Sequence, residues 1–243
     1  MQQPLPKQFQ QNLPENRCPS CLSMQLEGIP VQPDQIELYL TINFDVQCEP
    51  LPKGNIAFGL KGGKLQLRLE NGKIHHEFRE LTGSLALSRQ KEEQQTQSSQ
   101  MPGSLAGSEA EGYLLATADL NTEQTEAPKE QLPLVTCQVK TKGSQKNPVW
   151  DFKVDGEKTV LQGVLKKAKL ATLKVIAFPC SVEATFDVSL QDIYLTKVQG
   201  LWPVNISTNQ LVVLERGIAQ LLLERKLKPY LSRVELQFDN FES

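Results

Sequence analysis

The chain has 243 residues, with 26 Lys and Arg against 28 Asp and Glu, a formal net charge of -2 at pH 7. Hydrophobic residues make up 39% of it, enough to build one sizeable core. The balanced charge argues against a general nucleic-acid binder, and no run approaches the roughly 20 apolar residues that cross a bilayer. The first 18 residues also lack the apolar segment of a signal peptide. We therefore expect a cytoplasmic protein without a membrane span.

Residues 1–34 predict a flexible arm rich in Pro and Gln. Prolines interrupt any regular element in this segment, and Gln and Asn fill much of the remainder. From Ile36 to Cys48, apolar and polar residues alternate instead. A period of two predicts a long strand with one buried face. This strand is the first of a single β domain, which we expect to span residues 35–243.

Two glycine-containing dipeptides, Gly62-Gly63 and Asn71-Gly72, are typical of two-residue hairpin turns. If both form turns, the apolar residues of segment 56–78 all face one way and the polar residues face the other. A slip of one residue in either hairpin would destroy this agreement. The pattern therefore predicts an antiparallel meander over residues 56–78.

A long polar stretch follows. Residues 88–111 and 121–131 are rich in Gln, Ser and Glu and nearly free of large apolar side chains. Such segments bury too little apolar surface to offset the entropy of ordering, so we predict a disordered insertion around 88–132. A linker between two domains is the alternative interpretation.

The β pattern resumes after the insertion. Alternation predicts further strands over residues 135–139, 180–190 and 234–238. Residues 208–228 instead repeat apolar residues at mostly helical spacing, and Pro229 would end that helix. The sequence thus predicts a mainly β fold, an antiparallel sandwich or open barrel, with one C-terminal α-helix and a long polar insertion.

Cysteine is the first place to look for a metal site. Cys18 and Cys21 have the spacing of half a structural zinc site, but a complete site needs two further ligands. Cys48, Cys137 and Cys180 fall on the apolar faces of their strands, so we expect them to be buried. We assign no metal site, and Cys18 and Cys21 remain weak candidates for zinc or for a redox role.

No catalytic motif is recognisable. The chain lacks G-x-S-x-G, H-E-x-x-H and a calcium-binding loop. Its two histidines, His75 and His76, would point to opposite faces of a strand, with His76 partly buried beside Ile74 and Phe78. We assign no catalytic residue, expect no cofactor, and predict that the protein is not an enzyme.

Lysine is concentrated in residues 140–174, where nine lysines stand against three acidic residues. Lys166, Lys167 and Lys169 are possible phosphate contacts for non-specific nucleic-acid binding. The segment has no Arg, and its aromatic residues have the inward parity of core side chains. A solvated lysine edge that blocks aggregation between sheets explains the pattern equally well.

The predicted C-terminal helix is apolar on more than one face, so something must cover it. Packing on the β core is the simplest interpretation. The helix could also bind a protein partner or a second copy of the chain, through Leu211, Leu214, Ile218, Leu221 and Leu222. We expect a non-catalytic protein-interaction or assembly module, such as a subunit or adaptor. The alternatives are a β-fold protein that holds a hydrophobic or lipid ligand between sheet and helix, and the nucleic-acid binder.

Overall fold

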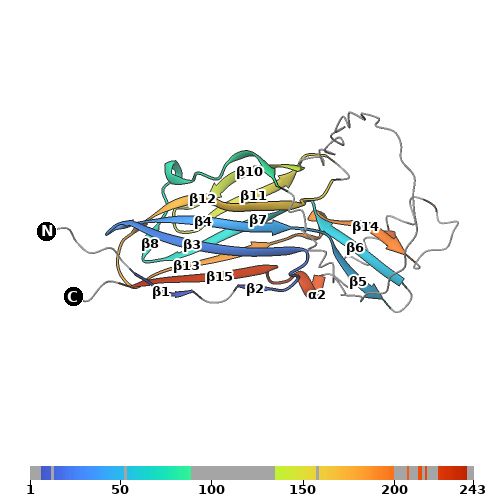
Figure 1. Cartoon of the computed structure of the whole chain (residues 1–243), viewed down its shortest axis with the longest axis horizontal. Helices are drawn as coiled ribbons and strands as arrows, with labels where there is room; N and C mark the ends of the chain where they lie inside the picture. Colours follow the sequence, from blue (N-terminus) through green and yellow to red (C-terminus); the bar gives the residue numbers. More distant parts are fainter. Residues whose placement is uncertain are drawn as a thin grey trace, which may run out of the picture. The chain divides into compact units, whose positions relative to one another are not determined.

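A computed structural model describes residues 7–11, 14–51, 54–88, 135–156, 159–199, 207, 213–214, 217 and 224–239. Within these ranges the protein is mainly β, and every strand pairing is antiparallel, as the sequence predicted. The strands form three sheets, which do not close into a barrel (Figure 1). These elements belong to one compact unit, made of residues 1–90 and 134–243. No helix in the described ranges is long and apolar enough to span a membrane.

Sheet A has eight strands, in the order β1-β15-β13-β7-β11-β10-β9, with β2 also paired to β15. Its strands are β1 (Lys7–Gln11), β2 (Glu15–Asn16), β7 (Gly62–Glu70), β9 (Gly83–Leu87), β10 (Val135–Gly143), β11 (Pro148–Val154), β13 (Cys180–Asp187) and β15 (Ser232–Asp239).

Sheet B has four strands, in the order β3-β4-β12-β8, and sheet C has three, in the order β14-β6-β5. The strands of sheet B are β3 (Leu22–Gln32), β4 (Gln35–Phe44), β12 (Gly163–Val175) and β8 (Gly72–Lys73). Those of sheet C are β14 (Ile193–Gln199), β6 (Gly54–Leu60) and β5 (Gln47–Leu51). The short helices are η1 (His76–Phe78), η2 (Leu190–Asp192) and α2 (Glu224–Leu227).

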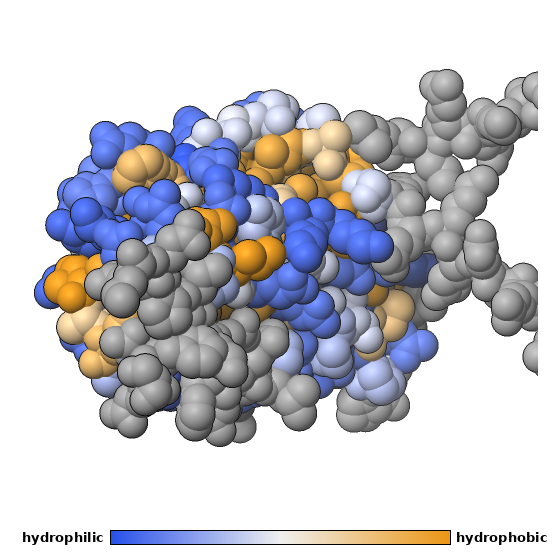
Figure 2. All heavy atoms as spheres, turned by 60° about the vertical axis from the view of Figure 1, so that its left-hand side comes forward, coloured by the Kyte–Doolittle hydropathy of each residue, from blue (hydrophilic) through white to orange (hydrophobic). Residues whose placement is uncertain are grey.

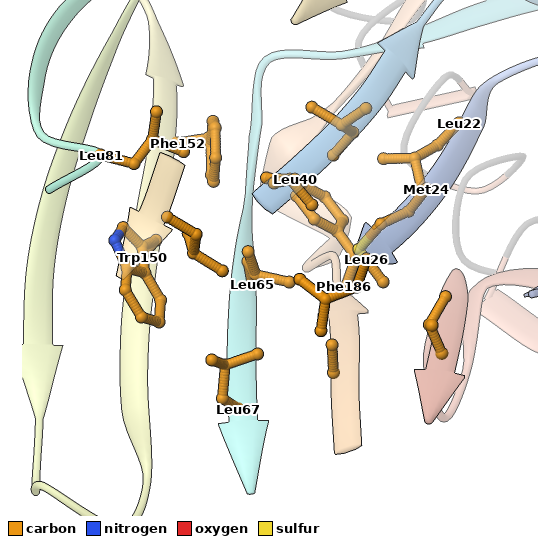
Figure 3. Close-up of a cluster of buried hydrophobic side chains, with 14 of the residues drawn as sticks. Leu22, Met24, Leu26, Leu40, Leu65, Leu67, Leu81, Trp150, Phe152 and Phe186 are labelled. Carbon is orange, nitrogen blue, oxygen red and sulfur yellow. The ribbon is translucent and has the colours of Figure 1, made fainter. Parts of the chain in front are cut away.

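Sheets A and B pack face to face as a sandwich. Phe44 of β4 packs against two rings of sheet A, with centroid distances of 6.1 Å to Phe152 and 5.7 Å to Phe186. Figure 3 shows side chains of β3 and β4, such as Met24 and Leu40, meeting those of β7, β11 and β13 in the layer between the sheets. The core forms because β4, β13 and β15 bury every second residue, as their sequence alternation predicted.

Part of the predicted N-terminal arm is instead a core strand. The segment from Leu22 to Gln32 forms β3 and pairs with β4 along almost its whole length. Leu22, Met24 and Leu26 are fully buried. The arm prediction over 1–34 is therefore wrong for β3, because these apolar residues alternate and Pro30 lies close to the strand end.

The predicted meander over 56–78 is also wrong in its pairing. β6 pairs with β5 and β14, whereas β7 pairs with β11 and β13. Gly62 and Gly63 form no turn; they lie within β7, where a Cβ on Gly63 would stand 2.3 Å from the ring of Phe186. Asn71, with φ of 56°, does turn the chain, but it leads from sheet A into β8 of sheet B.

The predicted faces of this segment are largely correct even though its pairing is not. Phe58, Leu65 and Ile74 are fully buried. Phe78 departs from the pattern: it lies in η1 and is 42% exposed. The buried faces are predicted correctly because the alternation can be read within each strand, whereas strand pairing depends on distant segments.

Sheet C continues from the sandwich through a single residue. Only Lys61 separates β6 from β7, and both of its backbone groups are paired. Its N–H donates to the Asp192 carbonyl at 2.6 Å, and its carbonyl accepts from the Val154 N–H at 2.9 Å. We call this connection the Lys61 joint.

Two predicted segments lie largely outside the described residues. The insertion around 88–132 is described only at Ser88, whose backbone bonds to Val164. The helix predicted over 208–228 is not supported as one element: within it, the described residues are helical at 213–214, at 217 and in α2, of four residues.

Candidate functional site

Several loops converge at the end of the sandwich where β3 turns into β4 and β12 leads to β13. The Val175 N–H donates to the Asp34 carbonyl at 2.8 Å, and the Ile176 N–H donates to the Asn71 carbonyl at 2.8 Å. The Asn71 side-chain amide in turn donates to the Pro179 carbonyl at 2.7 Å. These hydrogen bonds tie three chain connections together, so the end of the sandwich is a defined surface.

This surface exposes large apolar side chains. Ile176 is 59% exposed, Val31 is 41% exposed and Ile29 is 39% exposed. We call these three residues the apolar end. Figure 2 turns this side of the molecule toward the reader and shows hydrophobic residues in several patches among hydrophilic ones. An ion pair of 3.9 Å between Lys174 and Asp34 lies beside the loops.

The predicted phosphate contacts lie in β12, where the strand bulges. The register with β4 shifts between Leu165 and Ala168, and Lys167 adopts a φ of 46° while its N–H donates to the Thr41 hydroxyl. A bulge of this kind re-aims the side chains around it. Lys166 is exposed, and the described residues include no ion-pair partner for it.

The other two lysines are engaged by carboxylates. Lys167 pairs with Glu27 at 3.2 Å, and Lys169 pairs with both Glu37 and Glu80 at 2.8 Å. Hydrogen bonds to these two carboxylates raise the pKa of Lys169. A phosphate would therefore have to compete with carboxylates already in place, which weakens the phosphate interpretation.

Lysines on the outer face of sheet A alternate with acids across the strands. Asp187, Lys64, Asp151 and Lys140 stand opposite one another in register on β13, β7, β11 and β10. Opposite charges at facing positions stabilise a sheet and leave little net field. A surface groove of about 540 Å³ on β10 and β11 has the same mixed character. It is lined by Gln138, Lys140, Asp151, Lys153, Val154 and Asp155.

Cys18 and Cys21 lie in a tight turn before β3. The Cys18 carbonyl accepts both the Cys21 N–H and the Leu22 N–H at 2.9 Å. Both cysteines are fully buried and free. Burial raises the pKa of Cys21 to about 12 and also raises that of Cys18, which disfavours the thiolates that zinc requires. No group of three or more potential metal ligands occurs in the described part of the chain, so nothing there completes a zinc site.

The remaining cysteines only partly follow their predicted burial. Cys137 and Cys180 are buried, and burial raises the pKa of each thiol to about 11. Cys48 is exposed, which corrects the prediction, because β4 ends at Phe44 and the alternation does not continue into β5.

The histidines are not placed as the sequence predicted. His76 is exposed in η1 and is not part of a strand, so its predicted partial burial is wrong. His75 packs edge-on against Phe78, with ring centroids 6.1 Å apart. Within the described residues, neither imidazole hydrogen-bonds to a serine or cysteine that it could activate as a nucleophile.

Most of the predicted partner-binding residues lie outside the described residues: Leu211, Ile218, Leu221 and Leu222. Leu214 is described and is 41% exposed, and its neighbour Val213 is 70% exposed. The predicted binding role of this segment stays a prediction, to which these two exposures add support.

Sequence reasoning missed the role of Arg79. Its side chain is only 5% exposed, and its guanidinium donates to the carbonyls of Lys142, Gly143 and Ser144 at 2.8, 3.2 and 2.8 Å. It thereby fixes the turn between β10 and β11. No local pattern could have revealed this role, because the accepting carbonyls follow more than sixty residues later.

The sequence also failed to single out the apolar end, because Ile29 and Val31 fall in the predicted arm and Ile176 falls in an irregular apolar stretch. Compared with known protein families, with curated proteins and with solved structures, the chain shows no significant match.

Proposed function

We propose that this protein is a non-catalytic interaction module that binds another protein through exposed apolar side chains, as a subunit or adaptor of a larger assembly. The observation that carries the proposal is the apolar end. Its side chains stay exposed although the two sheets of the sandwich already cover each other, so core formation does not account for them. Exposed apolar side chains gathered on one surface are typical of protein-interaction sites.

The rigidity of the apolar end supports the proposal. Backbone hydrogen bonds hold Ile176 against Asn71, and the neighbouring Val175 against Asp34. A surface that is fixed before binding loses little conformational entropy when a partner docks. The apolar end therefore has both the chemistry and the order that a docking surface needs.

The other candidate surfaces have less to offer. Two of the three lysines proposed to contact phosphates, Lys167 and Lys169, are paired with Glu27, Glu37 and Glu80. The groove on β10 and β11 combines two lysines with two aspartates. Neither arrangement favours one class of ligand as clearly as exposed Ile and Val favour an apolar partner surface.

The test replaces Ile176 by Asp and, separately, Val31 by Asp. Light scattering after size-exclusion chromatography measures self-association over a range of concentrations. Capture from native lysate with quantitative cross-linking then compares the proteins that bind to each variant. We expect an association that either substitution weakens at least tenfold, the effect of removing one interface anchor. Ala86→Asp, at an exposed position of β9, is the matched control and should leave the association unchanged.

A monomeric wild type whose captured proteins are the same for Ile176→Asp, Val31→Asp and Ala86→Asp would contradict the proposal for the apolar end. If only Leu214→Asp lost the association, the docking surface would instead be the segment around Leu214.

A further inference from the structure

We propose that Cys18 and Cys21 are a modification site, at which a reversible intramolecular disulfide closes the turn between β2 and β3. This inference is independent of the proposed interaction function. It begins from the turn itself, in which the Cys18 carbonyl accepts the N–H groups of both Cys21 and Leu22 at 2.9 Å.

The turn brings the two cysteines within bridging distance. A turn closed by a hydrogen bond between its first and fourth residues keeps their Cα atoms within roughly 7 Å. A disulfide needs a Cα separation of about 4.4–6.8 Å. Both side chains also enter the same core, where each is fully buried. The turn therefore holds the two residues at a separation that suits a disulfide.

The surroundings disfavour ionised sulfur, so the resting states of the pair are two neutral thiols or one disulfide. Burial is the largest cause that raises the pKa of both thiols. At Cys18 the charge of Glu49 adds to it while Lys226 and Arg17 act in the opposite direction, and at Cys21 both Cys18 and Asp45 add to it. A disulfide carries no charge and no S–H group, so it suits an apolar site better than a thiolate does.

The reaction is thiol–disulfide exchange with a low-molecular-weight disulfide such as oxidised glutathione. One cysteine thiolate attacks a sulfur of glutathione disulfide, which gives a mixed disulfide and releases one glutathione thiolate. The second cysteine thiolate attacks the protein sulfur of the mixed disulfide and releases the second glutathione. The two protein thiols lose two electrons and two protons, and the glutathione disulfide is reduced to two thiols.

Access is available through the turn. Pro19 and Ser20, between the two cysteines, are exposed, so the thiols lie directly beneath a surface turn. Local opening of a few residues is enough to admit the oxidant. Cys137 and Cys180, in contrast, lie on the central strands of sheet A, where opening requires much more of the fold to separate.

The experiment uses the full chain with Cys48→Ser, which removes the exposed thiol. The folded protein is equilibrated in mixtures of reduced and oxidised glutathione, quenched in acid, unfolded and alkylated. Intact mass then counts free thiols, and a digest locates them. We expect two alkyl groups fewer in oxidising mixtures, one Cys18–Cys21 linkage, full alkylation of Cys137 and Cys180, and reversal by reduced glutathione.

Circular dichroism during equilibration shows whether the bond forms in the folded protein. Four free thiols at every glutathione ratio would overturn the proposal, as would separate glutathione adducts on Cys18 and Cys21, or a linkage that appears only in denaturant. The same mixtures applied to the wild type serve as a positive control, because exposed Cys48 should take up glutathione.

Discussion

Gly28 of β3 lies so close to Phe238 of β15 that a Cβ on this glycine would stand 2.4 Å from the Cζ atom of the ring. Phe238 is fully buried. The two strands belong to opposite sheets, so the missing side chain of Gly28 sets how closely sheets A and B approach along this side of the sandwich.

Gly28→Ala should therefore destabilise the fold. The added methyl group forces the ring of Phe238 or the strand itself to shift, and overpacking of this kind costs about 1–3 kcal/mol. Urea unfolding measures the free energy of unfolding directly. Gly217→Ala is the control, because nothing lies within 4 Å of a Cβ added there. Equal stabilities of Gly28→Ala and the wild type would refute the close approach.

Arg79→Lys should loosen the turn between β10 and β11. Lysine keeps the charge but cannot reach the carbonyls of Lys142 and Ser144 with the fork of a guanidinium. We expect the free energy of unfolding to fall by about 1.5–3 kcal/mol, the range for hydrogen bonds to a charged group. Hydrogen exchange should also accelerate in residues 143–147. The same exchange pattern in Arg79→Lys and wild type would exclude this role, and exposed Arg68→Lys should change neither quantity.

Glu37→Gln should reduce the acid sensitivity of stability. Hydrogen bonds from Lys169 and then Tyr39 lower the pKa of Glu37 in the folded state. A carboxyl with a lowered pKa stabilises the fold above its unfolded pKa of roughly 4.3, and this contribution is lost as the pH falls through the folded pKa.

Because this ion pair lies at the surface, we expect its contribution to be about 0.2–1 kcal/mol. Urea unfolding at pH 6 and at pH 3 should show a smaller difference for Glu37→Gln than for the wild type. Glu77→Gln, at an exposed position of η1, should keep the wild-type difference. Identical pH profiles for Glu37→Gln and wild type would count against the ion pair.

The five cysteines should differ sharply in reactivity. Cys48 is exposed, whereas the other four are buried and their thiol pKa values are raised by burial. A thiol reagent such as Ellman's reagent should modify one cysteine rapidly and the rest only as the protein opens. Cys48→Ser should remove the fast phase. A fast phase of two or more equivalents would show that another thiol is accessible.

What the sequence predicts well is the face of each strand. The alternation in β4, β13 and β15 can be read from a few consecutive residues, and burial follows it. The buried Cys137 and Cys180 were predicted from the same local rule. The mainly β fold class follows from the number of such strands, and the alternation of buried and exposed residues in them is typical of antiparallel sheets.

What the sequence does not predict is which strands become neighbours. Gly62-Gly63 has the composition of a hairpin turn, but glycine is needed there because a Cβ would meet the Phe152 carbonyl at Gly62 and the ring of Phe186 at Gly63. The role of Arg79 is equally impossible to predict from the sequence, because the carbonyls that its side chain binds, at 142–144, are distant in sequence. The apolar end combines Val31 of β3 with Ile176, which directly follows β12, and both strands pair with β4, so its composition depends on pairings between distant segments.

The Lys61 joint fixes the number of residues between β6 and β7 at one. Loops elsewhere in such a protein can accommodate an added residue. Here the backbone passes directly from a strand of sheet C to a strand of sheet A, so an added residue would change the register of one of them. An insertion between Leu60 and Gly62 would shift β6 or β7 by one residue against its partners. In β7, where buried and exposed residues alternate, such a shift would turn Leu65 toward solvent. We therefore expect homologous chains to vary in loop length but to keep a single residue between β6 and β7.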